Sequence, residues 1–327
     1  MDPLTPPDAA KDFLCAPRAR LAIEQLFKRG AFEGGFVIAG PQSQGKATLA
    51  FLLAATLLSG GQSLGEMDPK VQSLIAAGAH PDLKVLRRRE NERTGKLRDE
   101  IDVAGARGVI ETLHHTSVSG HMVVIVDLAD ELGRQAANSL LKILEEPPKG
   151  ATLFLLSRSP SCLLPTLTSR CRRLVLGSVH LAPLSQWIAQ RADIPLTEAE
   201  GFARDSGGAP GLALRLALGE GGGASGIADS FLRAVAGQQD LLSAARKFGG
   251  KGAEGSAEEA IGLILQRLRL KLSETAHERE TLARQLKTYE VAEAMFAHRG
   301  TADAVQTAYI AGLKMRDALA GKAIYVR

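Results

Sequence analysis

Seven residues near the amino terminus have the spacing of a phosphate-binding loop. The segment Gly40–Lys46 is GPQSQGK, with glycine at its first and sixth positions and lysine at its seventh. In such loops the backbone N–H groups point inward around phosphate oxygens, and the lysine reaches the outer phosphates. An apolar run at 35–39 precedes the loop and a helical pattern follows it, which is the order of elements that this chemistry needs. The candidate cofactor-binding residues here are Gly40, Gln44, Gly45, Lys46, Ala47 and Thr48.

Two groups that ATP hydrolysis needs are missing from this pattern. Ala47 stands where Ser or Thr would supply a hydroxyl to Mg²⁺, and Thr48 comes one residue too late, on another face of the helix. The β-branched run at 121–127 predicts a buried strand ending at Asp127, whose carboxylate can hold Mg²⁺ through water. Leu128 follows, and its apolar side chain cannot accept a proton from an attacking water. The sequence therefore predicts a phosphate cradle without hydrolysis; the alternatives are a chance glycine turn and a structural Asp127 that caps a helix.

Three further segments carry recognisable motifs, and the one at 136–148 is long and distinctive. They are His80–Leu83 (HPDL), Ala136–Pro148 (AANSLLKILEEPP) and Leu164–Cys171 (LPTLTSRC). Together with the phosphate loop they resemble the bacterial clamp-loader family of AAA+ proteins, whose hallmark is the Ser-Arg-Cys triplet at 169–171. The motifs that carry the resemblance lie between residues 35 and 176.

The resemblance implies a fold in three parts. An α/β P-loop (AAA+) parallel-sheet domain is expected at 1–177, a small helical lid at 178–222, and an all-α C-terminal collar domain for oligomerisation at 223–327. Strand and helix patterns alternate in the first part, and the strand pattern ends with it, which agrees with this division.

Two local patterns predict details of the helical part. The glycine-rich composition of 219–226 predicts a flexible linker. Ser256 and Glu259 predict a capping box ahead of a helix at 261–272.

The resemblance also implies a function. Within the family, the degenerate nucleotide site indicates a member that does not hydrolyse ATP and acts as a stator while the loader places a sliding clamp on primed DNA during replication. Arg170, in the Ser-Arg-Cys triplet, is then an arginine finger that acts in trans on the ATP of a neighbouring subunit. The alternative for Arg170 is a structural pairing with a carboxylate of its own chain. The chain itself would be inactive as an ATPase, although it would belong to a DNA-directed DNA polymerase (nucleotidyltransferase) holoenzyme.

Partners and cofactors are implied in the same way. The partners are loader subunits of the gamma/tau and delta types, the sliding clamp through the complex, and primer–template DNA in the assembled loader, with no membrane. No cofactor is required, and weakly bound ATP, ADP or phosphate is compatible with the loop.

Two other functions compete with this interpretation. One is an ATP-hydrolysing gamma/tau-type subunit, against which stand Ala47, Leu128, and Gly211 at the place of the family's second sensor arginine. The other is a small-molecule phosphotransferase, which the helical C-terminal third and the Ser-Arg-Cys triplet disfavour. The first sensor residue is either Ser157 or Arg158, and the sequence leaves that choice open.

Composition sets the remaining bounds. The 327 residues carry a net charge of +4, which permits nucleic-acid binding without demanding it. The family's four-cysteine zinc module has no counterpart at 59–80, and the three cysteines, Cys15, Cys162 and Cys171, are too scattered for a zinc site, so no metal is expected. So few cysteines and the absence of a long apolar run predict a cytoplasmic protein.

Overall fold

The computed structural model describes residues 5–90, 98, 100–113, 117–219, 222–249, 254–274, 278–297 and 304–322. Most of the charged loop that the sequence suggests at 87–99 and the histidine pair at 114–115 lie outside these residues.

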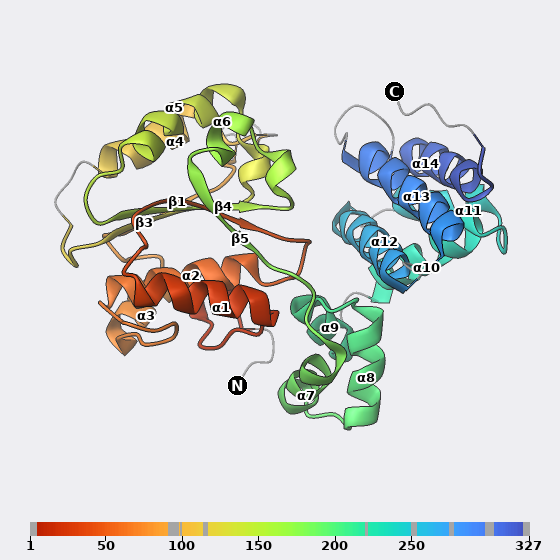
Figure 1. The fold of residues 1–327 in the computed structure, drawn as a ribbon, viewed down its shortest axis with the longest axis horizontal. Coiled ribbons are helices and arrows are strands. Elements are labelled where there is room, and N and C mark those ends of the chain that lie inside the picture. Colours follow the sequence, from red (N-terminus) through yellow and green to blue (C-terminus); the bar gives the residue numbers. More distant parts are fainter. Residues whose placement is uncertain are drawn as a thin grey trace. The chain divides into compact units, whose positions relative to one another are not determined.

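A parallel five-stranded sheet forms the centre of the first part of the chain (Figure 1). Its strands are β1 (Gly34–Ala39), β2 (Leu83–Leu86), β3 (Met122–Val126), β4 (Ala151–Ser157) and β5 (Cys171–Val175). The order across the sheet is β2-β3-β4-β1-β5, and every neighbouring pair is parallel. Strands β1, β3 and β4 are buried along their whole length, as expected for a sheet covered on both faces.

Helices cover both faces of this sheet (Figure 1). One face carries α1 (Pro17–Lys28), α2 (Lys46–Leu58) and α3 (Pro69–Ala76), with the side chains of Phe36 and Phe154 in the core beneath them. The other face carries α4 (Val103–Thr112), α5 (Arg134–Glu145) and the single turn α6 (Pro165–Thr168). The carboxyl ends of β1, β3 and β4 meet at one edge, where the phosphate loop, Asp127 and Ser157 are placed.

The rest of the described chain is helical. The helices are α7 (Leu181–Ala192), α8 (Leu196–Asp205), α9 (Pro210–Ala217), α10 (Gly222–Val235), α11 (Leu241–Arg246), α12 (Glu254–Glu274), α13 (Arg279–Ala297) and α14 (Ala304–Leu319). Short 3₁₀ turns occur at Pro7–Ala9, Ala129–Glu131, Pro160–Cys162 and Lys247–Gly249.

The predicted fold class, a parallel α/β domain followed by helices, is confirmed. The described chain clusters into two compact units, one of residues 1–200 with 208–214, the other of 201–207 with 215–327. The division into three domains at residues 177 and 222 stays a prediction.

Two local predictions in the helical part are wrong. Residues 222–226 belong to α10 rather than to a flexible linker, because Ala224 and Ala228 are buried where α10 packs on α12. Ser256 lies inside α12, which spans Glu254–Glu274, so it does not cap the helix.

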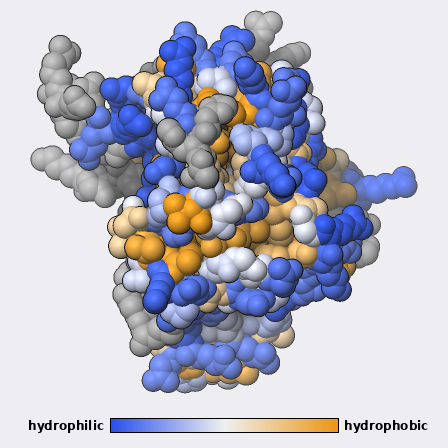
Figure 2. Space-filling view, turned by 90° about the vertical axis from the view of Figure 1, so that its left-hand side faces the viewer, coloured by the Kyte–Doolittle hydropathy of each residue, from blue (hydrophilic) through white to orange (hydrophobic). Residues whose placement is uncertain are grey.

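Apolar side chains on the surface are mostly scattered. The most exposed large ones are Val118, Leu21 and Val175. Figure 2 shows one face on which hydrophilic residues dominate and a small group of apolar side chains gathers. Among the described helices, none is both long and apolar enough to cross a membrane.

Candidate functional site

The phosphate loop joins β1 to α2 and depends on two glycines. Gly45 has a φ of +81°, a conformation that glycine adopts without strain. A Cβ on Gly40 would lie 2.8 Å from the carbonyl oxygen of Leu176, so only glycine fits where the loop passes the end of β5. The two glycines therefore allow the tight backbone path between β1 and α2 that the motif predicts.

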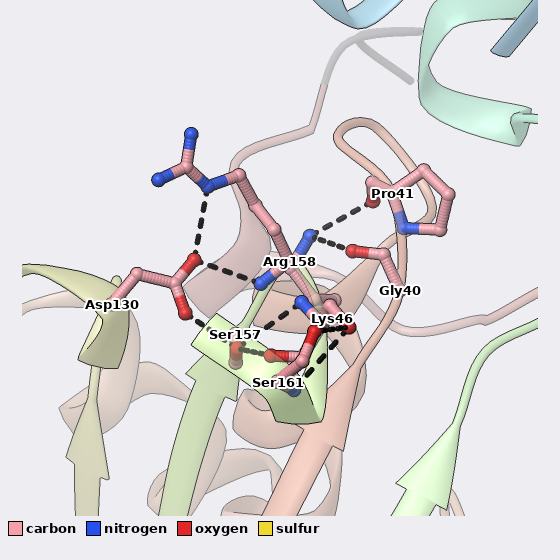
Figure 3. A network of polar contacts seen from close by, with 8 residues as sticks. Gly40, Pro41, Lys46, Asp130, Ser157, Arg158 and Ser161 are labelled. Atoms are coloured by element: carbon pink, nitrogen blue, oxygen red, sulfur yellow. Dashed lines mark hydrogen bonds and ion pairs between the residues drawn. The ribbon is translucent and has the colours of Figure 1, made fainter. Parts of the chain in front are cut away.

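Lys46 is held by the loop that it follows (Figure 3). Its Nζ donates to the carbonyl oxygens of Gly40 and Pro41, each at 2.8 Å. Burial lowers the pKa of Lys46 to about 8, although the nearby carboxylate of Asp130 acts in the opposite direction. A bound anion beside Lys46 would therefore favour the charged form of this lysine.

One polar side chain of the loop lacks a partner. Gln44 is only 2% exposed, and its amide Nε2 has no hydrogen-bond partner among the described residues. A buried donor left unpaired costs free energy, which a ligand oxygen would recover. By contrast, Ala47 in the first turn of α2 packs against the apolar core and brings no ligand for Mg²⁺.

The carboxylate of Asp127, which follows β3, pairs with an arginine. Asp127 accepts a hydrogen bond from Arg87 Nε at 3.1 Å, which joins the ends of β3 and β2. Leu128 follows in the left-handed region with a φ of +57° and is 40% exposed. The position where an ATPase of this type would carry its water-activating carboxylate thus presents an apolar side chain on a strained backbone.

A second carboxylate, Asp130, was missed in the sequence and connects the residues at the end of β4 (Figure 3). Its side chain is 2% exposed, and it accepts hydrogen bonds from the hydroxyl of Ser157 at 2.5 Å, the backbone N–H of Arg158 at 2.9 Å and Arg158 Nε at 3.0 Å. Both candidates for the first sensor position therefore contact the same carboxylate. The run of acidic residues after the strand at 121–127 was the available signal.

The first turn of α9 contacts the phosphate loop directly. The N–H of Gly211 donates to the carbonyl oxygen of Ser43 at 3.0 Å. A Cβ on Gly211 would lie 3.0 Å from that same oxygen. The glycine at the place of the family's second sensor arginine therefore allows backbone-to-backbone contact.

The segment before α1 also contacts the loop. A Cβ on Gly45 would meet the ring of Phe13 at 2.8 Å, so this ring lies against the loop. The neighbouring Asp12 accepts two hydrogen bonds from Arg191 Nη1 of α7, each at 2.7 Å. The segment before α1 is thus joined both to the loop, through Phe13, and to α7, through Asp12.

Arg170 follows α6 and is partly exposed, with 34% of its side chain accessible. Its Nε donates to Glu145 Oε1 at 2.8 Å, and its Nη2 lies 2.6 Å from the same oxygen. Nη1 donates to the carbonyl oxygen of Thr166 at 2.9 Å. The structure thus brings Arg170 and a carboxylate of its own chain together, while the finger role stays a prediction.

The HPDL segment has a structural role. Asp82 is buried, and it accepts hydrogen bonds from the N–H groups of Val118 and Ser119 and from the hydroxyl of Ser117. Its own N–H donates to His80 Nδ1 at 3.2 Å. The segment therefore fixes the loop ahead of β3.

No metal centre is formed by the described residues, among which no three His, Cys, Asp or Glu side chains gather as ligands. The cysteines at 15, 162 and 171 form no disulfide. The expected absence of zinc stays a prediction.

Comparisons with known proteins agree with the motifs. A sequence model of the family described as DNA polymerase III, delta subunit, matches residues 16–180. A DNA polymerase III subunit delta' of Pseudomonas aeruginosa is 36% identical over 197 residues, which are 59% of this chain and 58% of that protein. The subunit delta' of Escherichia coli is 36% identical over 148 residues, 45% of this chain and 42% of that protein. This chain spans about half the length of these curated relatives.

Solved structures resemble the chain more distantly. A DNA polymerase III gamma-subunit-related protein of Thermotoga maritima has a TM-score of 0.42 and 17% identity, over 92% of this chain and 97% of that one. The RuvB Holliday junction branch migration motor of the same organism has a TM-score of 0.44 and 17% identity, over 94% and 91%.

The segment matched by the family model makes up half of the chain. It contains the phosphate loop, Asp127 and Arg170, which are the residues whose geometry is described above. The chain therefore belongs to the DNA polymerase III delta-subunit family.

Proposed function

We propose that this chain is the delta' subunit of a DNA polymerase III clamp loader and that it does not hydrolyse ATP. In this role it helps to load the sliding clamp onto primed DNA and supplies Arg170 to the nucleotide of a neighbouring ATPase subunit. Membership of the family and the delta' names of the similar proteins support the assignment. Its partners are then subunits of the gamma/tau and delta types, with the clamp and primer–template DNA engaged in the assembled loader, and its compartment is the cytoplasm.

One observation carries the non-hydrolysing part of the proposal. Asp127 is paired with Arg87, and the next residue is Leu128 rather than a carboxylate. Together with Ala47, this leaves the phosphate loop without the hydroxyl that binds Mg²⁺ and without the base that activates water. The chain's own residues can bind and orient a phosphate, but they cannot remove a proton from water at that place.

Weak binding of phosphate, ADP or ATP forms a second part of the proposal. The backbone at the start of α2, the Nζ of Lys46 and the unpaired Nε2 of Gln44 are the donors that support it. The hydrogen bond from Gly211 to Ser43 places the first turn of α9 beside this loop.

The arginine finger supports hydrolysis at a neighbour. A guanidinium keeps its charge at all physiological pH values and can bridge two phosphoryl oxygens. It stabilises the negative charge that develops as the phosphoryl group is transferred. Arg170 is partly exposed after the turn of α6, as a residue acting on another subunit must be.

Reconstitution tests the proposal. The purified chain alone is expected to show no ATP hydrolysis above background, and turnover near ~1 s⁻¹ would favour the gamma/tau-type alternative instead. Mixed with candidate gamma/tau and delta subunits, it is expected to join their complex on gel filtration and to be needed for clamp loading. In that complex Arg170→Ala is expected to fold and assemble but to lower ATP hydrolysis at least about tenfold. An unchanged rate would assign Arg170 to a structural role.

A further inference from the structure

Arg170 is fixed by two segments that are distant in sequence. Glu145, the last residue of α5, accepts a hydrogen bond from its Nε through Oε1, and Nη2 forms an ion pair with the same oxygen at 2.6 Å. On the other side, Nη1 donates to the carbonyl oxygen of Thr166 and to the hydroxyl of Ser169 at 3.3 Å. A guanidinium has five N–H groups, so one N–H on Nη2 has no partner among the described residues. The group is therefore oriented and still has a donor to offer.

A glutamate at position 145, the carboxyl end of α5, does not stabilise this helix. A carboxylate at the carboxyl end of a helix is unfavourable because the helix dipole is negative there. Its side chain is 50% exposed, so it contributes little to the core, and an ion pair this exposed adds little stability. The contact with Arg170 is the interaction that this side chain makes.

We propose that Glu145 is a positioning residue for Arg170. This inference rests on the proposed function, in which Arg170 contacts the nucleotide of a neighbouring subunit. An unrestrained arginine side chain samples many rotamers and loses conformational entropy when it is ordered. If Glu145 already holds one rotamer before the neighbouring subunit binds, this entropy is not lost at the reaction step. Glu145 holds the Nε edge, and the Thr166 carbonyl holds Nη1, so the guanidinium plane is set by α5 and α6 together. Rate depends steeply on such placement.

The test uses the reconstituted loader and separates kcat from KM for ATP. Glu145→Ala is expected to lower kcat about tenfold and to leave KM nearly unchanged, because the neighbour's own loop binds the ATP. Glu145→Gln keeps the shape and an acceptor oxygen, so it is expected to restore most of the rate. Glu146→Ala is the matched control: it removes the adjacent carboxylate, which has no contact with Arg170 in the described structure, and it is expected to behave as the wild type.

The double variant distinguishes this inference from the proposed function. Arg170→Ala with Glu145→Ala is expected to have the rate of Arg170→Ala alone, since Glu145 acts through Arg170. If Arg170→Ala itself leaves the rate unchanged, the finger role in the proposed function fails. If Arg170→Ala lowers the rate but Glu145→Ala does not, or if Glu145→Ala raises it, the positioning role is overturned. Should Glu145→Ala fail to assemble, Glu145→Asp carries the test, because it keeps the charge, is one methylene shorter and is expected to lower kcat by a smaller factor.

Discussion

The backbone N–H of Gly211 donates a hydrogen bond of 3.0 Å to the carbonyl oxygen of Ser43. This contact places the first turn of α9 on the phosphate loop with no side chain between the two backbones. The contact is this close because Gly211 has no Cβ, so substituting this glycine tests it.

Gly211→Ala is expected to destabilise the protein by about 1–3 kcal/mol, because its Cβ would press on the Ser43 oxygen in a packed region. Thermal unfolding measures the change. Gly201→Ala in α8 is the control, since a Cβ there meets nothing within 4 Å, and the higher helix propensity of alanine should stabilise by about 0.5–1 kcal/mol. Equal effects of the two substitutions would mean that the Gly211 contact does not matter.

Anion binding at the phosphate loop is expected to weaken as the pH rises through about 8, the value to which burial lowers the pKa of Lys46. Below this pH the lysine carries its charge and attracts an anion; above it the lysine is neutral. Titration calorimetry with sulfate at several pH values measures the affinity, because sulfate keeps its charge over this range. Lys46→Met should bind more weakly and lose the pH dependence, whereas an affinity of the wild type that is constant up to pH 9.5 contradicts the prediction.

Asp82→Ala is expected to lower the free energy of unfolding by about 2–3 kcal/mol, because buried N–H groups of Val118 and Ser119 lose their acceptor. Burial alone would raise the pKa of Asp82, but the hydrogen bonds from Ser119, Val118 and Ser117 outweigh it and hold that pKa below its ordinary 3.8. The stabilisation is therefore complete above pH 4 and is lost as the pH falls through the lowered pKa. Urea unfolding of the variant and the wild type at pH 6 and pH 3 measures this.

The control for Asp82 is Asp317→Ala. It removes an exposed ion pair with Lys322 and should cost less than about 0.5 kcal/mol. If both variants lose the same amount, the buried network around Asp82 contributes nothing specific.

Thiol labelling is expected to distinguish the three cysteines. Burial raises the pKa of the Cys171 thiol to about 11 and also raises the pKa of Cys15, whereas Cys162 is exposed. Because the thiolate is the reactive form, Cys162 should react with maleimide at pH 8 at least roughly tenfold faster than the other two. Cys162→Ser should remove the fast phase, and a fast phase that persists in this variant would assign reactivity to a buried thiol.

The central sheet was predictable because its strands are continuous apolar runs bounded by turns. The apolar run at 35–39 lies within β1, and the run at 121–127 contains β3. Signals that depend on a few polar residues did worse. The pair Ser256 and Glu259 has the spacing of a capping box, yet α12 already begins at Glu254, so local spacing misplaced the helix start.

The site was predictable where a motif fixes the backbone and not where residues meet across the fold. The spacing of GPQSQGK predicted the loop, and its glycines adopt the geometry that it requires. Nothing in the sequence paired Asp127 with Arg87, which are forty positions apart. For Asp130 the acidic run after the strand at 121–127 was a signal, but its contacts with Ser157 and Arg158 arise only in the fold, and local spacing does not encode them.

Gly211 and Leu128 together limit how a hydrolytic site could be built into this chain. A Cβ at 211 would lie 3.0 Å from the carbonyl oxygen of Ser43, so α9 or the loop would have to shift slightly to admit a side chain there. A carboxylate introduced at 128 would stand on a left-handed backbone beside an Asp127 that pairs with Arg87. Engineering an ATPase into this fold therefore calls for coordinated changes in the loop, at the end of β3 and in α9.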